Sequence, residues 1–255
     1  MKWITMIIFV FFLSTIAAAD CPDRGIWALS RSSVLNRNGI IILEFHGGDE
    51  RIVPGLGKQY PVYLESEKEK VILTVVETFD GEKSLTEVVL RPVSLLTENE
   101  TYTLRIDGLT PFQSRPERFN DSTYQPESPT YKINNLIDTD APAFDADPSE
   151  QKKTLKYYGC GPASWVYFTI KGTDKSELFV KAKVKNTVSG YTSVYILPVE
   201  NGVTKVGSGM CIGAFTLNGS DNFEVAFQLY DQSGNGSNWG KYIPFTRPAV
   251  VSRNE

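Results

Sequence analysis

Asn134-Asn135-Leu136-Ile137-Asp138-Thr139-Asp140-Ala141-Pro142 divides the chain, because these residues carry no apolar period and end in Ala-Pro. Pro142 disfavours an α conformation at the preceding residue and lacks a backbone N–H, so a strand has to end before it. Strand-like patterns of about 110 residues lie on each side, close to the usual size of a domain with one core. The segment therefore predicts two all-β modules, at residues 20–133 and 143–250, joined by a linker at 134–142.

The N-terminal residues have the pattern of a secretion signal. Lys2 precedes an apolar run from Ile4 to Ile16, and Ala17 to Ala19 supply the small residues that a signal peptidase accepts. We therefore expect residues 1–19 to be a signal peptide and the mature protein to be secreted, periplasmic or at the cell surface. The run is too short to span a bilayer comfortably, and no later stretch is apolar enough, so we do not expect a membrane-embedded protein.

The charge balance is that of an ordinary soluble surface. The 255 residues carry 26 Lys and Arg against 30 Asp and Glu, a formal net charge of −4. A nucleic-acid-binding protein is expected to show a basic excess that releases phosphate counterions. The composition therefore argues against a nucleic-acid partner.

Strand patterns dominate the first module. Ile40 to Phe45 and Val71 to Val76 are β-branched runs that predict central strands, and Leu85 to Arg91 continues the series. From Tyr102 to Ile106, apolar residues alternate with polar ones, which predicts a strand with one buried face. Short strands separated by Gly, Asn or Pro indicate a sandwich.

Thr110 to Pro129 interrupts this pattern. The stretch is polar, contains four prolines and shows no period, so it predicts a long loop or an excursion in two parts. Two interpretations remain open: a mobile insertion, or a binding loop that uses Phe112 and Tyr124.

The second module contains a row of lysines. Phe179 to Lys185 alternates cleanly and places Lys181, Lys183 and Lys185 on one predicted solvent face. Such a row fits an edge strand that lysines protect from pairing with another chain, or a surface that holds an acidic polymer. The core of this module is predicted to include Phe223, Val225, Phe227 and Leu229.

Two stretches resemble tandem bacterial Ig-like modules of the SbsA or fibronectin-like type. The first runs from Leu90 to Leu109, where a strand and a leucine-bearing turn precede Tyr102-Thr103; the second is the Asp-x-x-Gly-Asn-x-Ser turn from Asp231 to Ser237. The resemblance implies two tandem Ig-like β-sandwiches. It also agrees with a tyrosine corner, in which the Tyr102 hydroxyl bonds back to the turn backbone.

The three cysteines allow one disulfide in an exported chain. Cys160 and Cys211 lie in Gly-flanked turns of the same module, whereas Cys21 lies near the mature N-terminus. We predict a Cys160 to Cys211 disulfide, which would close a loop of about 50 residues and contribute on the order of 4 kcal/mol.

The residues that nucleophilic catalysis needs are scarce. His46 is the sole histidine, so a zinc site with two imidazoles is excluded. Gly159 to Trp165 faintly resembles the active-site segment of papain-like proteases, but there the histidine follows the cysteine, whereas His46 precedes Cys160. No nucleophile elbow, phosphate-binding loop or dinucleotide fingerprint is present. We therefore predict that the protein is not an enzyme.

Paired carboxylates leave an enzymatic alternative open. A glycosidase needs two Asp or Glu residues on either side of a bond, and 30 acids are available. In that case Trp165 and Trp239 would stack on sugar rings, although packing in the core or under loops explains both.

Acidic residues also gather at the junction. Asp138 and Asp140, followed by Asp145 and Asp147, offer carboxylate oxygens to calcium, but no EF-hand spacing is present and a solvated linker explains them better. No other cofactor is expected.

These observations predict an exported, non-enzymatic Ig-like protein with a structural, adhesive or ligand-binding role. Its partner is an unidentified protein or glycan, and the alternative is a carbohydrate hydrolase or carbohydrate-binding module. The residues predicted for ligand binding are Lys181, Lys183, Lys185 and Trp239.

Overall fold

The computed structural model describes residues 24–120 and 125–249. The predicted signal peptide and Cys21 lie outside the described residues. Within them the chain is all-β, with seventeen strands and one 3-10 helix, η1 (Gly48–Gly55). None of the described helical segments is long and apolar enough to cross a membrane. The all-β fold class predicted from the sequence is therefore confirmed.

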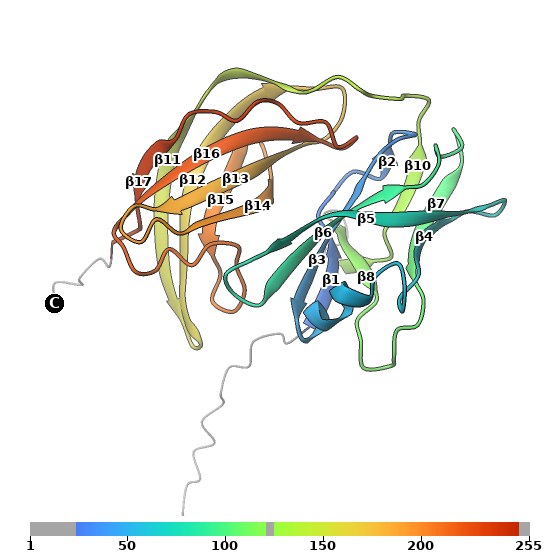
Figure 1. The fold of residues 1–255 in the computed structure, drawn as a ribbon, viewed down its shortest axis with the longest axis horizontal. Coiled ribbons are helices and arrows are strands. Elements are labelled where there is room, and N and C mark those ends of the chain that lie inside the picture. The colour runs from blue at the N-terminus through green and yellow to red at the C-terminus, as the bar shows by residue number, and fades with distance from the viewer. Residues whose placement is uncertain (1–23, 121–124, 250–255) are drawn as a thin grey trace, which may run out of the picture.

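Ten strands of the N-terminal half form a single sheet (Figure 1). Its order is β2-β10-β7-β4-β5-β6-β3-β1-β8-β9. The strands are β1 (Arg24–Ala28), β2 (Val34–Leu35), β3 (Ile41–Gly47), β4 (Val62–Glu65), β5 (Lys70–Asp80), β6 (Leu85–Pro92), β7 (Thr101–Ile106), β8 (Pro116–Asn120), β9 (Gln125–Glu127) and β10 (Thr130–Ile133). The sheet curls around a core that includes Leu43, Val62, Leu73 and Leu104.

This curled sheet differs from the predicted sandwich of two separate sheets. Strand β5 is the cause, because it connects the two groups of strands that separate sheets would contain. It pairs with β4 near Lys70 and with β6 from Leu73 to Asp80. A register shift between Val75 and Glu77 marks a bulge, and bulges bend a strand and increase its twist. The two-sandwich arrangement is therefore not confirmed for this half.

The strands predicted for this half are confirmed, and so is the tyrosine corner at Tyr102. Strands β3 and β5 are central, as the β-branched runs indicated. Tyr102, Leu104 and Ile106 of β7 are buried, and the backbone N–H of Thr97 donates to the Tyr102 hydroxyl at 3.2 Å. The Tyr102 hydroxyl also donates to the Glu69 carboxylate.

The stretch from Thr110 to Pro129 is more ordered than predicted. It contains β8 and β9, and β8 pairs in parallel with β1. Arg118 is buried and donates to the backbone oxygens of Ser32 and Thr130, at 2.9 and 3.3 Å. The hydrogen bonds of buried Arg118 therefore hold β8 in place, although its sequence lacks the apolar alternation of the other strands. Phe112 is 80% exposed, and Tyr124 lies outside the described residues.

The C-terminal half is a sandwich of two sheets. One has the order β11-β12-β15 and the other β14-β13-β16-β17. The strands are β11 (Ala143–Tyr158), β12 (Gly161–Thr173), β13 (Leu178–Asn186), β14 (Thr192–Pro198), β15 (Val203–Ser208), β16 (Asn222–Asp231) and β17 (Ile243–Thr246). Their inward faces share one core, in which Phe168 of β12 meets Phe227 of β16 edge to face with ring centroids 5.1 Å apart. The predicted core residues Phe223, Val225, Phe227 and Leu229 are all buried.

Strand β13 is not an edge strand. It pairs with β14 on one side and β16 on the other, so the interpretation of its lysines as edge protection is wrong. The alternation within a strand reports its two faces, whereas its place in a sheet depends on partners distant in sequence.

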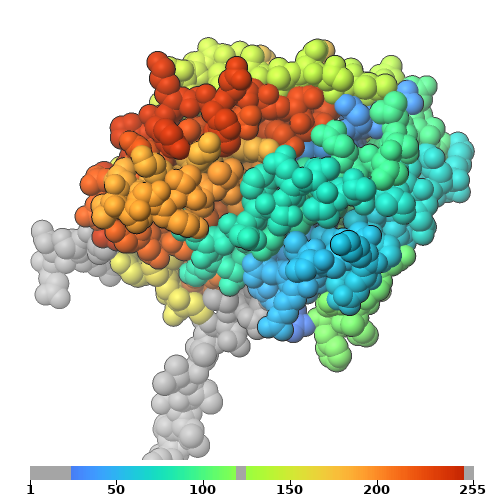
Figure 2. Space-filling view, viewed as in Figure 1, coloured from blue at the N-terminus to red at the C-terminus, as the bar shows by residue number. Residues whose placement is uncertain are grey.

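The two halves are packed against each other (Figure 2). A cluster of buried side chains joins the outer faces of the two sheets at this contact: Ile40, Ile42, Val89, Phe179, Ile196 and Tyr230. The turn between β5 and β6 reaches across as well, since Lys83 forms an antiparallel bridge with Gly213 and Glu82 accepts hydrogen bonds from Ser193 and Thr216. The halves therefore share a packed interface.

The segment at 134–142 is partly buried rather than a solvated linker. Asp138 is 1% exposed, and its backbone N–H donates to the Asn38 side chain at 3.1 Å. Its backbone oxygen accepts from Asn38 and from Asn235, at 2.7 and 3.1 Å. These bonds tie the junction to both halves.

Candidate functional site

The predicted lysine row divides between two environments. Lys181 lies under the first half of the protein, only 9% exposed, and its ammonium contacts both oxygens of Glu77 at 2.9 and 2.7 Å. It also lies 4.2 Å from the ring centroid of Tyr230. Lys181 is therefore part of the interface between the halves and is not accessible to a ligand, which corrects the prediction of a solvent-facing site.

Lys183 and Lys185 lie beyond this interface, each beside an aromatic ring. The Lys183 ammonium is 4.1 Å from the ring centroid of Trp239, and that of Lys185 is 5.8 Å from Tyr242. Lys185 also pairs with Glu224 at 3.1 Å. Within the described residues, no carboxylate lies within ion-pairing distance of Lys183. Cations within about 6 Å of an aromatic face are attracted by the ring quadrupole.

The backbone after β16 places these two rings. The Asp231 side chain accepts the N–H groups of Ser233 and Asn235, each at 2.8 Å, and Gly234 has a φ of 83° that closes the turn. The returning segment then bonds to β16 itself, since the N–H of Gly240 donates to the Phe227 oxygen at 2.8 Å. Trp239 is thereby held beside Lys183 of β13.

We define the lysine–aromatic face as Lys183, Lys185, Trp239 and Tyr242. Trp239 and Tyr242 are 36% and 44% exposed. Exposed rings beside ammonium groups can stack on apolar ligand surfaces while the ammonium groups attract negative charge. The sequence prediction included Lys183, Lys185 and Trp239 but missed Tyr242, whose approach to Lys185 depends on the return of the chain along β16.

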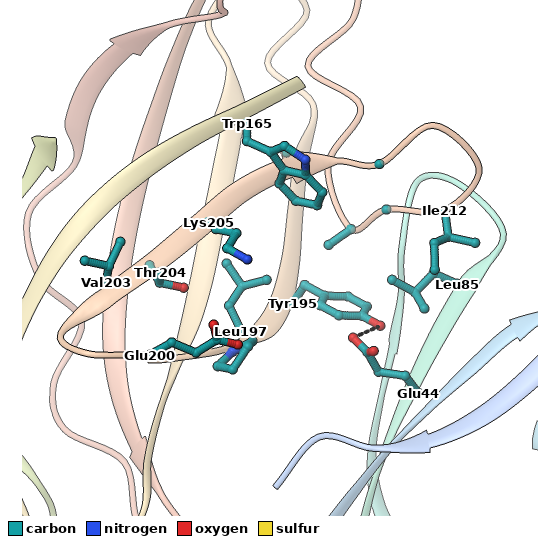
Figure 3. Close-up of a pocket in the computed structure, with 15 residues that line it drawn as sticks. Glu44, Leu85, Trp165, Tyr195, Leu197, Glu200, Val203, Thr204, Lys205 and Ile212 are labelled. Carbon is teal, nitrogen blue, oxygen red and sulfur yellow. Dashed lines mark hydrogen bonds between the residues drawn. The ribbon is translucent and has the colours of Figure 1, made fainter. Parts of the chain in front are cut away.

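A cavity of about 250 Å³ lies between the two halves (Figure 3). Most of its walls are apolar, with Trp165, Leu197 and Ile212 from the second half and Leu85 from the first. Trp165, which the sequence offered as a sugar-stacking residue, lines this cavity between the halves instead. The Thr204 hydroxyl is buried without a hydrogen-bond partner among the described residues.

The polar side of this cavity holds Tyr195 and Glu44. The Tyr195 hydroxyl donates to the Glu44 carboxylate at 3.4 Å, and burial together with Glu44 raises the Tyr195 pKa well above its usual value. The Glu44 oxygen Oε2 also lies 3.4 Å from His46 Nε2. His46 lies near the end of β3, which agrees with the sequence prediction. The Tyr195–Glu44 contact therefore joins the two halves.

A fully buried carboxyl, Glu87, lies directly across the strands from Glu44. One oxygen accepts the backbone N–H of Ile196 at 2.9 Å, and the other has no partner among the described residues. Burial, followed by the charge of Glu44, raises the Glu87 pKa well above its ordinary value. A glycosidase carboxyl has to reach its substrate. Glu87 is sealed inside the interface, so this carboxyl pair does not fit that role.

The described residues do not confirm the predicted pairing of Cys160 with Cys211, which stays a prediction. The two residues nevertheless lie at one end of the second half, because the Cys160 N–H lies 3.4 Å from the Met210 sulfur. Cys160 is exposed in the turn between β11 and β12. Peptide mapping without reduction assigns the pairing among Cys160, Cys211 and Cys21.

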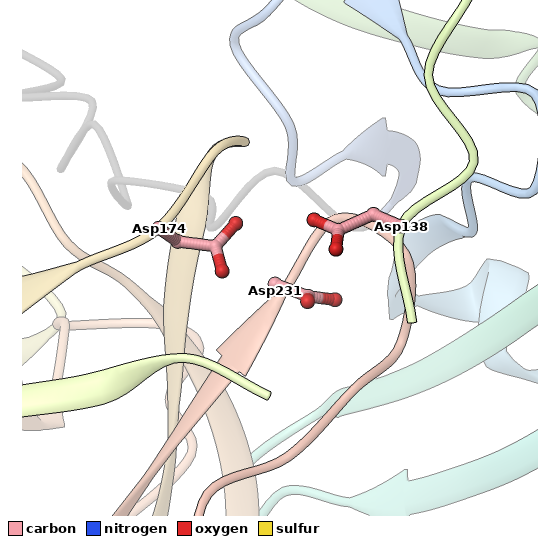
Figure 4. Close-up of side chains that lie close together, drawn as sticks. All are labelled: Asp138, Asp174 and Asp231. Carbon is pink, nitrogen blue, oxygen red and sulfur yellow. The ribbon is translucent and has the colours of Figure 1, made fainter. Parts of the chain in front are cut away.

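Three aspartates converge where the junction meets the second half (Figure 4). Asp138 comes from the junction segment, Asp174 from the turn between β12 and β13, and Asp231 from the end of β16, and one oxygen of each lies within 4.8 Å of the others. We call these residues the aspartate cluster. Asp140, the second predicted metal ligand, instead pairs with Lys175 at 2.5 Å, while Asp145 and Asp147 are exposed on β11.

Comparisons with known proteins do not assign a family. No family model matches the sequence, and no curated protein sequence matches it. Structures with weak similarity include pullulanase type I from Bacillus subtilis str. 168 complexed with maltose, at 15% identity and a TM-score of 0.25, and pullulanase from Anoxybacillus sp. LM18-11, at 11% and 0.26. These matches cover 88% and 84% of this chain but 24% of each pullulanase, so the chain spans about a quarter of their length. The tandem Ig repeats of Dlar match at 10% identity and a TM-score of 0.24, over 88% of this chain and 96% of that one.

Proposed function

We propose that this is an exported, non-enzymatic binding protein whose ligand surface is the lysine–aromatic face. The observation that carries the proposal is the contact of the Lys183 ammonium with the exposed Trp239 ring at 4.1 Å. Export rests on the N-terminal sequence pattern alone. The resemblance of the two halves to Ig-like modules agrees with a binding or adhesive role.

The chemistry of the face favours an acidic glycan as the ligand. Trp239 and Tyr242 offer apolar rings on which sugar faces can stack, and Lys183 and Lys185 offer charge for carboxylate or sulfate groups. Opposite Lys183 on β16 stands Ala226, which is buried.

A glycan array that includes uronate-bearing and sulfated polysaccharides tests the proposal. Trp239→Ala should weaken binding by about 2 kcal/mol or more, roughly 30-fold, as expected for a central aromatic anchor. Lys183→Ala should weaken binding and reduce its dependence on salt.

Matched controls separate these effects from general damage. Phe112→Ala removes an exposed ring from the first half, and Lys171→Ala removes an exposed lysine from the other sheet of the sandwich. Both should bind as the wild type does. Binding that survives Trp239→Ala, or turnover of a polysaccharide by the purified protein, would refute the proposal.

A further inference from the structure

Asp138 is the residue that distinguishes the aspartate cluster from an ordinary acidic surface. Its side chain is 1% exposed, and one carboxylate oxygen, Oδ2, is buried without a hydrogen-bond donor among the described residues. The other oxygen accepts the N–H of Asp140 at 3.1 Å. Figure 4 shows the Asp138 carboxylate pointing toward the other two aspartates. A buried anionic oxygen without a donor is costly unless a cation satisfies it.

The other two carboxylates are held in place by their own turns. Asp174 Oδ1 accepts the N–H and hydroxyl of Ser176 at 2.7 and 2.8 Å. Asp231 is fully buried and accepts from Ser233 and Asn235. Both side chains are therefore positioned before any cation arrives, and preorganised ligands lose little entropy on binding.

Among the described residues, no Lys or Arg forms an ion pair with any of the three carboxylates. Lys175 interacts electrostatically with Asp138 and Asp174, but its close contact is with Asp140 at 2.5 Å. At about 4 Å, two unit charges still interact strongly in the partly buried surroundings of a protein. The cluster thus combines mutual repulsion with an unsatisfied oxygen.

We propose that Asp138, Asp174 and Asp231 bind one calcium ion that fastens the junction segment to the second sandwich. Hard cations with flexible coordination take carboxylate oxygens, and calcium accepts six to eight oxygen ligands, of which three aspartates supply a part. Asp138 belongs to the segment that leaves the first half, whereas Asp174 and Asp231 lie on the sandwich. The ion therefore joins three segments that are distant from one another in the sequence. This inference does not depend on the proposed glycan ligand.

Calcium titration of the full chain by calorimetry, together with thermal unfolding in calcium and in chelator, tests the site. We expect wild-type protein to bind one calcium per chain and to unfold at a higher temperature in calcium than in EGTA. Asp174→Asn should raise the calcium dissociation constant at least tenfold. In EGTA the same variant should be at least as stable as the wild type, because it relieves repulsion within the cluster.

Asp174→Asn is preferred to Asp231→Asn because Asp231 also holds the turn that follows β16. Asp147→Asn is the control, since it removes one negative charge from an exposed position on β11 and should change neither measurement. The proposal is overturned if calcium neither binds nor stabilises the wild type. It is also overturned if Asp174→Asn binds calcium as tightly as the wild type, because the ion then lies elsewhere.

Discussion

The buried carboxyl of Glu87 makes the stability of the protein depend on pH. Its pKa in the folded state lies well above the ordinary value of 4.5, first because it is buried and second because Glu44 is nearby. The unfolded chain loses this proton near the ordinary pKa, whereas the folded chain keeps it to a higher pH. Between the two pKa values the folded state therefore binds one more proton, and the free energy of unfolding falls as the pH rises.

The magnitude follows from this linkage. Each pH unit between the unfolded and folded pKa values of Glu87 lowers the free energy of unfolding by about 1.4 kcal/mol. The stabilisation is fully present below the unfolded pKa and is lost as the pH rises through the folded pKa. Glu87→Gln removes the titration and keeps an oxygen that can accept the N–H of Ile196. Its free energy of unfolding should therefore exceed that of the wild type by an amount that grows with pH over this range.

Urea unfolding of both proteins from pH 4 to pH 9 measures the difference. Glu98→Gln is the matched control, because Glu98 is exposed, and its curve should run parallel to that of the wild type. Asp231, whose pKa burial also raises, contributes to the slope of all three proteins and cancels in the comparison. Parallel wild-type and Glu87→Gln curves across the whole range would refute the reasoning, because Glu87 would then titrate alike in both states.

Two further predictions concern packing and the corner. Phe179 is 1% exposed in the cluster between the halves, so Phe179→Ala leaves a cavity there. This variant should lower the free energy of unfolding, measured in urea, by about 3–5 kcal/mol. Phe112→Ala, at an exposed position, should change it by less than about 0.5 kcal/mol. Tyr102→Phe removes the hydroxyl that bonds to Thr97 and Glu69 and should cost about 1–2 kcal/mol by the same assay; an unchanged midpoint would show that the corner adds no stability.

The sequence predicted the elements whose signal is local. Alternation along β7 and β16 identified their buried faces, because side chains on a strand alternate between its two sides. The Tyr102 hydroxyl bond was predictable for a similar reason, since its acceptor and donor lie only a few residues apart. The bulge in β5, which turns a predicted sandwich into one curled sheet, has no comparable local signature.

The candidate sites were less predictable because they depend on contacts between distant segments. Lys181 and Lys183 share one face of β13, yet the docking of the first half buries Lys181 against Glu77 and leaves Lys183 accessible. Asp138 was predicted as a metal ligand, but its partners Asp174 and Asp231 come from two other turns rather than from the neighbouring Asp140. No spacing rule connects residues that only the fold brings together.

The aspartate cluster and the lysine–aromatic face share a backbone segment. Asp231 ends β16 and holds the turn from which the chain returns to place Trp239 beside Lys183. Asn235 in that turn also donates to the Asp138 backbone oxygen, so the junction contacts the same turn from the other side. An ion at the cluster would restrain the start of the segment that carries both rings, and a restrained segment loses less entropy when a ligand orders it. Glycan binding is therefore best measured both in calcium and in EGTA, because loss of binding in EGTA alone would locate the requirement in this turn rather than in the face itself.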